Sequence, residues 1–356
     1  MIKYDDIVSI EKIEWAYHKI CLTTKHREKL VNFELNKFAN IMIIYSILKN
    51  RNYKHGFYNI FLIKIPKHRI IMSENLLDKI INHVVSEFVL SPLIEPKLLD
   101  FNVATRKDKG LDKGLFYVKK YLNLMRHDID SYYLLKCDIS KYFYNISHDV
   151  LYKKLDKIIE DKELLNLIME IVNSTDNNHV NQTIKKEIKH EIEIQTKQHH
   201  QELVSRLLDL PIYIKGYGLP IGNMTSQILA IFYLNDLDHY IKEQLHIKYY
   251  VRYMDDFLIF HQDLNYLKEC RKKIEKKLQE LNLFLNKKTN ILKVRDGFSF
   301  LGYRFSIRNK RLYILPSREM TKKIHKRVKK NGLDILNNYN GYLQRSSVKN
   351  LFESKK

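Results

Sequence analysis

The chain has 356 residues, and 45% of them are hydrophobic, which excludes a disordered protein and allows several subdomains around a continuous core. Lysine and arginine number 62 against 41 acidic residues, and the resulting net charge of +21 favours a polyanionic partner, either nucleic acid or an anionic membrane. No apolar run is long enough to span a bilayer and the N-terminal segment lacks the apolar core of a signal peptide, so nucleic acid is the favoured partner.

Helical and strand patterns alternate in the first half of the chain. The segment at 73–94 has an apolar stripe at helical spacing, and Ser73 is its candidate N-cap. The predicted elements are helices over 6–50, two short strands around a basic turn over 57–72, a helix over 73–94, a buried strand running into a turn over 132–146, and helices over 149–175.

An unusual charged segment occupies residues 177–203. Val180, Ile184, Ile188 and Ile192 recur every four residues among charged side chains. This spacing predicts a helical insertion that is largely solvated, and the alternative is an arm that binds a partner.

The second half of the chain begins with a glycine-marked loop. The predicted elements are this loop and a long apolar helix over 218–245, a β-hairpin over 249–260, a helix over 264–281, strands over 297–307 and a basic helical region at the end. Glycine and proline are scarce, at 10 and 6, so no flexible linker divides the chain. The three scattered cysteines predict neither a zinc site nor disulfides, and they are typical of a cytoplasmic protein.

Three aspartates stand where predicted strands end or turn. Asp138 closes the apolar strand YLLKCD, and Asp255 and Asp256 lie at the tip of the hairpin YYVRYMDDFLIF. If these strands share one sheet, Asp138 and Asp255 meet at one edge with Asp256 adjacent, and three carboxylates in close approach need cations to offset their repulsion. Two Mg²⁺ ions suit such ligands and would assist attack by a 3′-hydroxyl and departure of pyrophosphate. For the hairpin alone, an ordinary surface turn is the alternative.

Five motifs follow one another in a fixed order: CDISKYF, GLPIGNMTSQ, YMDD, NKKT and FLGYRF. From about residue 57 to 307 the chain thereby resembles the reverse transcriptases. The resemblance implies an α+β, right-hand polymerase fold with fingers, an antiparallel-sheet palm and a short helical thumb. The implied domains are an N-terminal helical extension at 1–50, fingers at 51–130, a palm at 131–307 that includes the insertion at about 177–203, and a thumb at 308–356.

The resemblance also implies an activity and its partners. The activity is RNA-directed DNA polymerisation with two Mg²⁺ ions, and the partners are an RNA template, a DNA or RNA primer and dNTPs, with a small accessory protein in one subfamily and no membrane. Asp138, Asp255 and Asp256 would hold the metals with help from the carbonyl of Ile139. Phe143 matches the aromatic gate that excludes a ribose 2′-hydroxyl, and the alternative is a core aromatic.

Basic residues match further family positions. Lys67 and Arg69 correspond to the fingers pair that binds the incoming triphosphate, for which the fixed donor fork of arginine is well suited, although a solvated basic turn is the alternative. Arg106 matches a second fingers motif that contacts nucleic acid. Lys288 matches the nucleotide-binding lysine that follows the YMDD hairpin.

The motif IGNMTSQ departs from the QGxxxSP of most reverse transcriptases. Ile221, Gly222 and Gln227 are the candidate nucleotide-binding residues here, and the two exchanges resemble the error-prone enzymes of diversity-generating retroelements. Replacing glutamine by Ile221 removes an amide that could hydrogen-bond near the nascent base pair. The alternative is a lineage variant with no effect on fidelity.

The segment 317–332 fits a thumb helix. Met320, Ile324 and Val328 form a narrow apolar stripe that would dock on the palm. The surrounding cations would follow the backbone of a duplex without reading its sequence. The candidate nucleic-acid-binding residues here are Lys322, Lys323, Lys326, Arg327 and Lys330.

Four functional hypotheses follow from these patterns. The first is a reverse transcriptase of a diversity-generating retroelement, and the main alternative is an antiphage or abortive-infection reverse transcriptase. An inactive RNA-binding scaffold is opposed by the intact aspartates, and an RNA-templated RNA polymerase is opposed by Phe143. Fewer than about sixty residues follow FLGYRF, too few for a maturase or endonuclease domain.

Overall fold

The computed structural model describes residues 2–24, 28–64 and 68–347. They form two compact units, each assembled from separate stretches of the chain. Within the described ranges, no helix combines the length and the apolar character needed to cross a membrane. The first unit comprises Met1–Leu98, Lys141–Asp236 and Gln279–Leu283, and the second comprises Leu99–Ser140, Leu237–Leu278 and Phe284–Lys356.

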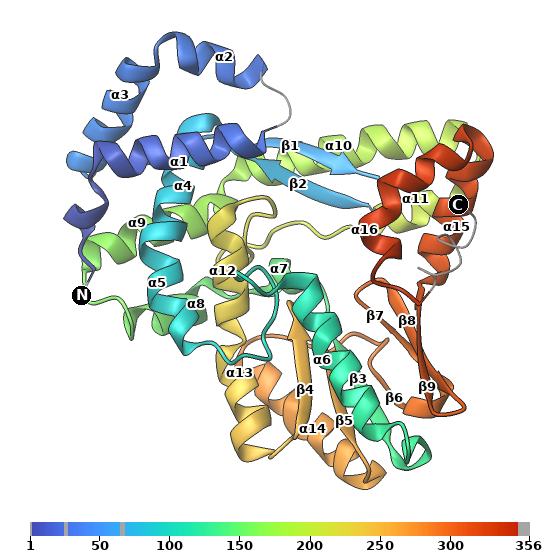
Figure 1. Ribbon diagram of the computed structural model, residues 1–356. Coiled ribbons are helices and arrows are strands. Elements are labelled where there is room, and N and C mark those ends of the chain that lie inside the picture. Colours follow the sequence, from blue (N-terminus) through green and yellow to red (C-terminus); the bar gives the residue numbers. More distant parts are fainter. Residues whose placement is uncertain (1, 25–27, 65–67, 348–356) are drawn as a thin grey trace. The chain divides into compact units, whose positions relative to one another are not determined.

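The first unit is mainly helical (Figure 1). Near the N-terminus, helix α1 packs against α3 and α4 through a stripe that includes the buried Ile13, Tyr17 and Ile20. The predicted helical region at 6–50 is therefore confirmed. The helices are α1 (Ile10–Thr23), α2 (Glu28–Leu35), α3 (Lys37–Lys49), α4 (Leu76–Val85), α5 (Ser91–Ile94), α7 (Tyr142–Asn145), α8 (His148–Asp156), α9 (Lys162–Val172), α10 (Asn178–Lys197), α11 (Gln201–Leu208) and α12 (Met224–Tyr233).

Helix α4 begins later than its sequence pattern predicts. Asn75, and not Ser73, is the N-cap, because the Asn75 side chain accepts a hydrogen bond from the Asp78 amide at 2.9 Å. Ser73 is instead the last residue of strand β2 (Arg69–Ser73), where it pairs with Asn59 of β1 (Asn59–Ile63). Pairing with β1 thus places Ser73 in the strand and not at the start of the helix.

The insertion is helical, and one of its faces is buried. Helix α10 runs along strand β1 (Figure 1), and Val180 and Ile184 enter an apolar cluster with Ile60 and Ile70 of the β1–β2 hairpin. The prediction of a largely solvated helix is therefore wrong for this face. The pattern misled because every fourth apolar residue is enough to cover a two-stranded hairpin.

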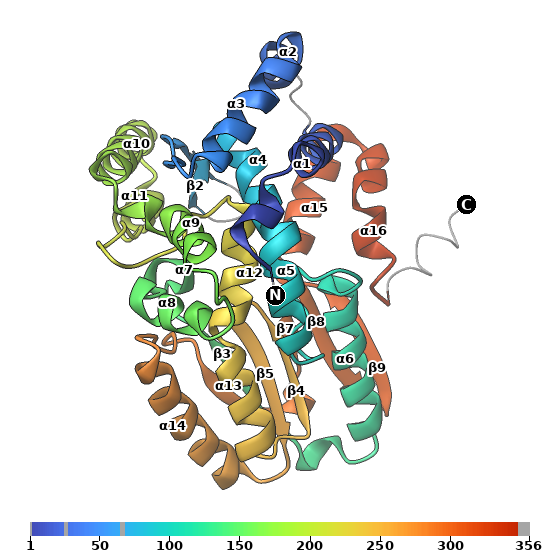
Figure 2. The same cartoon turned by 90° about the vertical axis from the view of Figure 1, so that its left-hand side faces the viewer.

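The second unit contains a four-stranded antiparallel sheet in the order β4-β5-β3-β6. Figure 2 shows helix α6 (Gly110–Met125) on one side of this sheet and α14 (Leu264–Glu280) on the other. This arrangement confirms the predicted mixture of helices with an antiparallel sheet. The strands are β3 (Tyr133–Asp138), β4 (Tyr249–Tyr253), β5 (Asp256–His261) and β6 (Asn290–Lys293).

A smaller antiparallel sheet, β7-β8-β9, precedes the C-terminal helices of the second unit. Helix α15 (Arg318–Asn331) buries Ile324 against Tyr339 and Leu343, so the predicted apolar stripe is its inner face. Four of the five candidate cations on this helix are exposed, and Lys323 is half-buried. The remaining elements are β7 (Phe298–Phe300), β8 (Tyr303–Arg308), β9 (Arg311–Pro316) and α16 (Asn340–Leu343).

Candidate active site

Two of the three predicted aspartates face each other across neighbouring strands. Asp138 at the end of β3 pairs in register with Asp256 at the start of β5. Residues directly opposite in an antiparallel pair project from the same face, with Cβ atoms about 5 Å apart. The sequence predicted Asp255 as the partner of Asp138. In the register Asp256 is the residue directly opposite Asp138, and Asp255 lies beside it in the two-residue turn with Met254.

The turn that carries Asp255 is strained. Tyr253 pairs with Asp256, so β4 and β5 are joined by a two-residue loop. Met254, the first residue of that loop, has a φ of 56°. Two-residue hairpin loops of this kind usually place glycine at such a position, and a side chain there costs about 1–2 kcal/mol. The rest of the unit must therefore hold this turn in place.

A second segment anchors the backbone of Asp138. The amide of Asn286 donates to the Asp138 carbonyl at 2.7 Å, and the Asp138 amide donates to the hydroxyl of Thr289 at 3.3 Å. Both partners belong to the NKKT motif. Lys288 lies between them with an exposed side chain, and its own amide is held by Asn286 at 3.0 Å. The structure thus brings the predicted Lys288 segment to the strand end that carries Asp138.

The donor set has the chemistry that magnesium requires. Carboxylate oxygens are the ligands that Mg²⁺ prefers, and it is usually bound through one or two carboxylates while water and substrate phosphates complete its shell. Among the described residues, no three or more His, Cys, Asp or Glu side chains are grouped so that they alone could hold a metal ion. Asp138, Asp255 and Asp256 offer oxygen donors of the kind that Mg²⁺ binds.

In the first unit, Phe143 lies on the short helix α7. It is half-buried, and its carbonyl accepts a hydrogen bond from the amide of Leu219 at 2.7 Å. Its neighbour Tyr142 is the buried one, with its hydroxyl on the carbonyl of Ala230. Tyr142 is therefore the buried residue of this pair, and Phe143 is partly exposed.

The loop that contains Ile221 and Gly222 lies against strand β2. The amide of Met72 donates to the carbonyl of Ile221 at 2.8 Å, and the Ile221 side chain packs against the cluster around Ile70. Gly222 has a φ of 139°, and a Cβ added there would lie 2.4 Å from the Met72 carbonyl oxygen. Only glycine fits this close approach. Gln227 is exposed on the first turn of α12.

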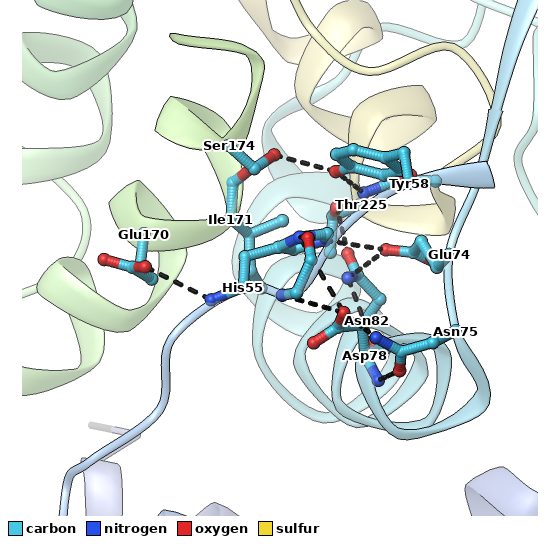
Figure 3. Close-up of polar contacts among 12 residues, drawn as sticks. His55, Tyr58, Glu74, Asn75, Asp78, Asn82, Glu170, Ile171, Ser174 and Thr225 are labelled. Carbon is cyan, nitrogen blue, oxygen red and sulfur yellow. Dashed lines mark hydrogen bonds and ion pairs between the residues drawn. The ribbon is translucent and has the colours of Figure 1, made fainter. Parts of the chain in front are cut away.

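Buried polar side chains hold the start of helix α12, which follows this loop (Figure 3). Thr225 donates to the amide oxygen of Asn82 at 2.6 Å, and Asn82 in turn donates to Glu74. Asn223 donates to the hydroxyl of Tyr58 at 2.9 Å. These supporting residues were not predicted, because Asn82, although fully buried, lies off the apolar stripe that the sequence shows for this helix.

Titratable groups continue this network. His55 lies 3.5 Å from Glu74 and 3.8 Å from Asp78, and the three side chains are only 1%, 4% and 1% exposed. Burial disfavours a charged His55, but Glu74 and Asp78 more than offset this, so the pKa of His55 is raised. Burial raises the pKa of Glu74 despite the opposing effect of His55. The cluster therefore holds its proton more tightly than the separate groups do.

The predicted basic residues have different surroundings. Lys67 lies outside the described residues, and Arg69 is exposed at the start of β2, opposite Ile63. Arg106 donates to the carbonyls of Leu99 at 2.8 Å and Asn102 at 3.0 Å. These bonds give Arg106 a structural role in its own loop.

Comparison with known proteins identifies the family. The family described as reverse transcriptase (RNA-dependent DNA polymerase) matches residues 48–305. No curated protein sequence matches the chain. Solved structures that are similar to this chain include telomerase from Candida albicans in complex with a fragment of telomeric RNA, with 17% identity and a TM-score of 0.47 over 76% of this chain and 46% of that one.

A second example is apo telomerase from Candida tropicalis truncated from its C-terminal domain. It has 13% identity and a TM-score of 0.46, with 78% of this chain and 60% of that one covered. The chain thus spans about half the length of these telomerases. The family match covers more than half of the chain, and the helices and antiparallel sheets have the right-hand polymerase fold. The chain therefore belongs to the reverse transcriptases, the RNA-dependent DNA polymerases.

Proposed function

We propose that the protein synthesises DNA on an RNA template by metal-dependent nucleotidyl transfer. The observation that carries this proposal is the pairing of Asp138 with Asp256 at the end of the β3–β5 ladder, with Asp255 in the adjoining turn. Side-by-side carboxylates repel each other, so such a pair is retained where it binds a cation. The +21 charge of the chain is suited to the template and primer.

The residues have distinct roles in this proposal. Asp138, Asp255 and Asp256 bind the metals, with the carbonyl of Ile139 as a further ligand. When bound, two Mg²⁺ ions would lower the pKa of the primer 3′-hydroxyl and neutralise charge on the departing pyrophosphate. Lys288 and Arg69 attract the triphosphate, and the ring of Phe143 excludes a ribose 2′-hydroxyl. The exposed cations of α15 contact the phosphates of the template–primer duplex.

Two biological settings suit this chemistry. Ile221 and Gln227 replace the glutamine and proline of most relatives, which favours an error-prone enzyme of a diversity-generating retroelement with a small accessory protein. Helix α10 is an additional element beside the β1–β2 hairpin, which favours an antiphage enzyme. The error spectrum of the cDNA separates the two, since only the first predicts errors concentrated opposite template adenines.

The proposal is tested by primer extension. The purified protein is given an RNA template with an annealed DNA primer, Mg²⁺ and dNTPs, and it should extend the primer. Asp255→Asn keeps the shape of the side chain but removes a metal-binding charge, so we expect extension to fall by at least about 10³-fold. The thermal unfolding midpoint should hardly change, because the turn is partly exposed. Extension by this variant at the wild-type rate would falsify the metal assignment.

A further inference from the structure

A fully buried ion pair lies behind the hairpin that carries Asp255. Arg252 of β4 donates through Nε and Nη2 to the two carboxylate oxygens of Asp238 at 2.7 and 2.5 Å. Asp238 belongs to helix α13 (Asn235–His239), and it also accepts from the hydroxyl of Tyr250 at 2.6 Å. Both charged side chains are 0% exposed. Such a pair is fixed in orientation, because three donors converge on one carboxylate.

The remaining nitrogen of the guanidinium reaches the strained turn. Arg252 Nη1 donates to the carbonyl of Met254 at 2.9 Å. Met254 is the residue with a φ of 56°, and the next residue is Asp255. The planar fork of arginine allows it to bind Asp238 on one edge and Met254 on another, which lysine cannot do with its single nitrogen. One side chain thus joins a buried carboxylate to the turn.

We propose that Arg252 is a positioning residue for metal binding, which holds the Met254–Asp255 turn while Asp238 orients its guanidinium. The inference rests on the proposed function, since it concerns the same aspartates. Fixing the carbonyl of Met254 fixes the peptide that leads into Asp255. The carboxylates of Asp255 and Asp256 then start from one orientation relative to Asp138 and need not be reordered when a cation binds.

A role in stability alone does not explain this arrangement. Apolar residues of similar volume are often as stabilising as a buried ion pair. An apolar side chain at 252 could fill the same space, but it could not donate to the carbonyl of Met254. The structure therefore separates packing, which a methionine can replace, from the hydrogen bond to the turn, which it cannot.

The test uses the full chain and Mn²⁺ as a spectroscopic substitute for Mg²⁺. The double variant Arg252→Met with Asp238→Asn leaves no unpaired buried charge, and the amide oxygen introduced by Asp238→Asn can still accept from Tyr250. Mn²⁺ binding is measured by electron paramagnetic resonance without nucleotide or primer, beside the thermal unfolding midpoint. We expect the double variant to fold and its Mn²⁺ affinity to fall by about tenfold or more, as is usual when a group that orients a metal ligand is lost. Half-saturation of primer extension should need correspondingly more Mg²⁺.

Two further variants keep the result interpretable. Tyr121→Phe removes a buried hydrogen bond of 2.9 Å to the Tyr250 carbonyl on the same strand, without reaching the turn, so it should bind Mn²⁺ like the wild type. Arg252→Lys keeps the charge beside Asp238 but not the fork, and it decides the question if the double variant does not fold. Mn²⁺ affinity within twofold of the wild type in a folded double variant, or in Arg252→Lys, overturns the inference. A wild type that neither binds Mn²⁺ nor extends primers defeats the proposed function instead.

Discussion

The turn at Met254–Asp255 and the loop at Ile221–Gly222 both carry predicted site residues, but they are held in opposite ways. Met254 has a side chain at positive φ, and a buried charged residue, Arg252, bonds its carbonyl. Gly222 has no side chain, and its backbone lies directly against the Met72 carbonyl. We therefore expect the Met254–Asp255 turn to be more sensitive to a change of charge than to a change of side-chain volume. We expect the Ile221–Gly222 loop to be more sensitive to added volume than to a change of charge.

The largest effect on stability is expected at Gly222. In Gly222→Ala the new Cβ would lie 2.4 Å from the Met72 oxygen at a φ that only glycine adopts readily, so strand β2 or the loop must move. We expect the free energy of unfolding to fall by about 3 kcal/mol or more. Gly216→Ala is the matched control, because it also has a positive φ, of 78°, but no atom lies within 4 Å of the added Cβ. It should cost only about 1 kcal/mol. Equal losses in denaturant titrations would show that strain, and not close approach, makes Gly222 necessary.

The next largest effect is expected at Phe143, in the selection of deoxyribonucleotides over ribonucleotides. Phe143→Ala should admit ribonucleotides, because the ring that would meet a 2′-hydroxyl is gone. We expect the ratio of kcat/KM for dNTP over rNTP to fall by about tenfold or more. Tyr142→Phe is the control, since it alters the neighbouring buried aromatic and its bond to Ala230 but leaves the ring of Phe143 in place. An unchanged ratio in Phe143→Ala would assign this residue to packing alone.

The difference between side-chain chemistry and backbone geometry also explains which parts of the site could be predicted from the sequence. In the proposed function Asp138, Asp255 and Asp256 would act through their side chains, and an acidic residue at the end of an apolar strand is visible without a structure. The register was not visible, since it depends on the length of the turn, and it placed Asp256 instead of Asp255 opposite Asp138. The supporting residues were missed altogether, because their roles arise from contacts between residues far apart in the sequence.

Helix α10 and strand β2 show a related limit. Local charge suggested a solvated helix at α10, but the uncovered face of the β1–β2 hairpin supplied a partner for Val180 and Ile184. Ser73 had the chemistry of an N-cap, yet pairing with Asn59 placed it in a strand. In both cases a tertiary or cross-strand contact overrode a correct local preference.

A smaller effect is expected from the titration of the network in Figure 3. The pKa values of His55 and Glu74 are both raised in the folded protein, so the folded state binds protons more tightly than the unfolded state. This contribution is complete at low pH and is lost as pH rises, first above the ordinary pKa of Glu74 and then through the raised pKa of His55. Unfolding free energies measured at several pH values from 5 to 8 should therefore decline, by about 1 kcal/mol from this source.

Removing the histidine isolates that contribution. His55→Gln keeps a polar side chain between Glu74 and Asp78 but cannot titrate. The variant should be less stable than the wild type at pH 5 and should lose less stability by pH 8. A pH profile parallel to that of the wild type would show that His55 does not exchange a proton in this range.

The smallest effect, a change in the error rate of DNA synthesis, is expected at Ile221, which is held both through its backbone and through its side chain. Its carbonyl is fixed by Met72, and its side chain packs against the cluster around Ile70. A glutamine here would supply an amide and could penalise mispairs through a polar contact. One such hydrogen bond is worth about 0.5–1.5 kcal/mol, or roughly two- to tenfold in error rate. Ile221→Gln should therefore lower the frequency of errors opposite template adenines by about that factor.

Sequencing the cDNA made by both proteins at identical dNTP concentrations gives the measurement. Leu210→Gln is the matched control, because it places an amide at the rim of the same cluster without altering the loop. If both variants lower the error rate equally, the effect reflects a loosened cluster and not the amide at 221. Uniformly low errors in the wild type would instead remove the case for a diversity-generating enzyme and favour the antiphage setting. High errors that Ile221→Gln leaves unchanged would retain the error-prone enzyme but assign its infidelity to other residues, since an apolar side chain alone cannot supply more than the roughly tenfold that one hydrogen bond allows.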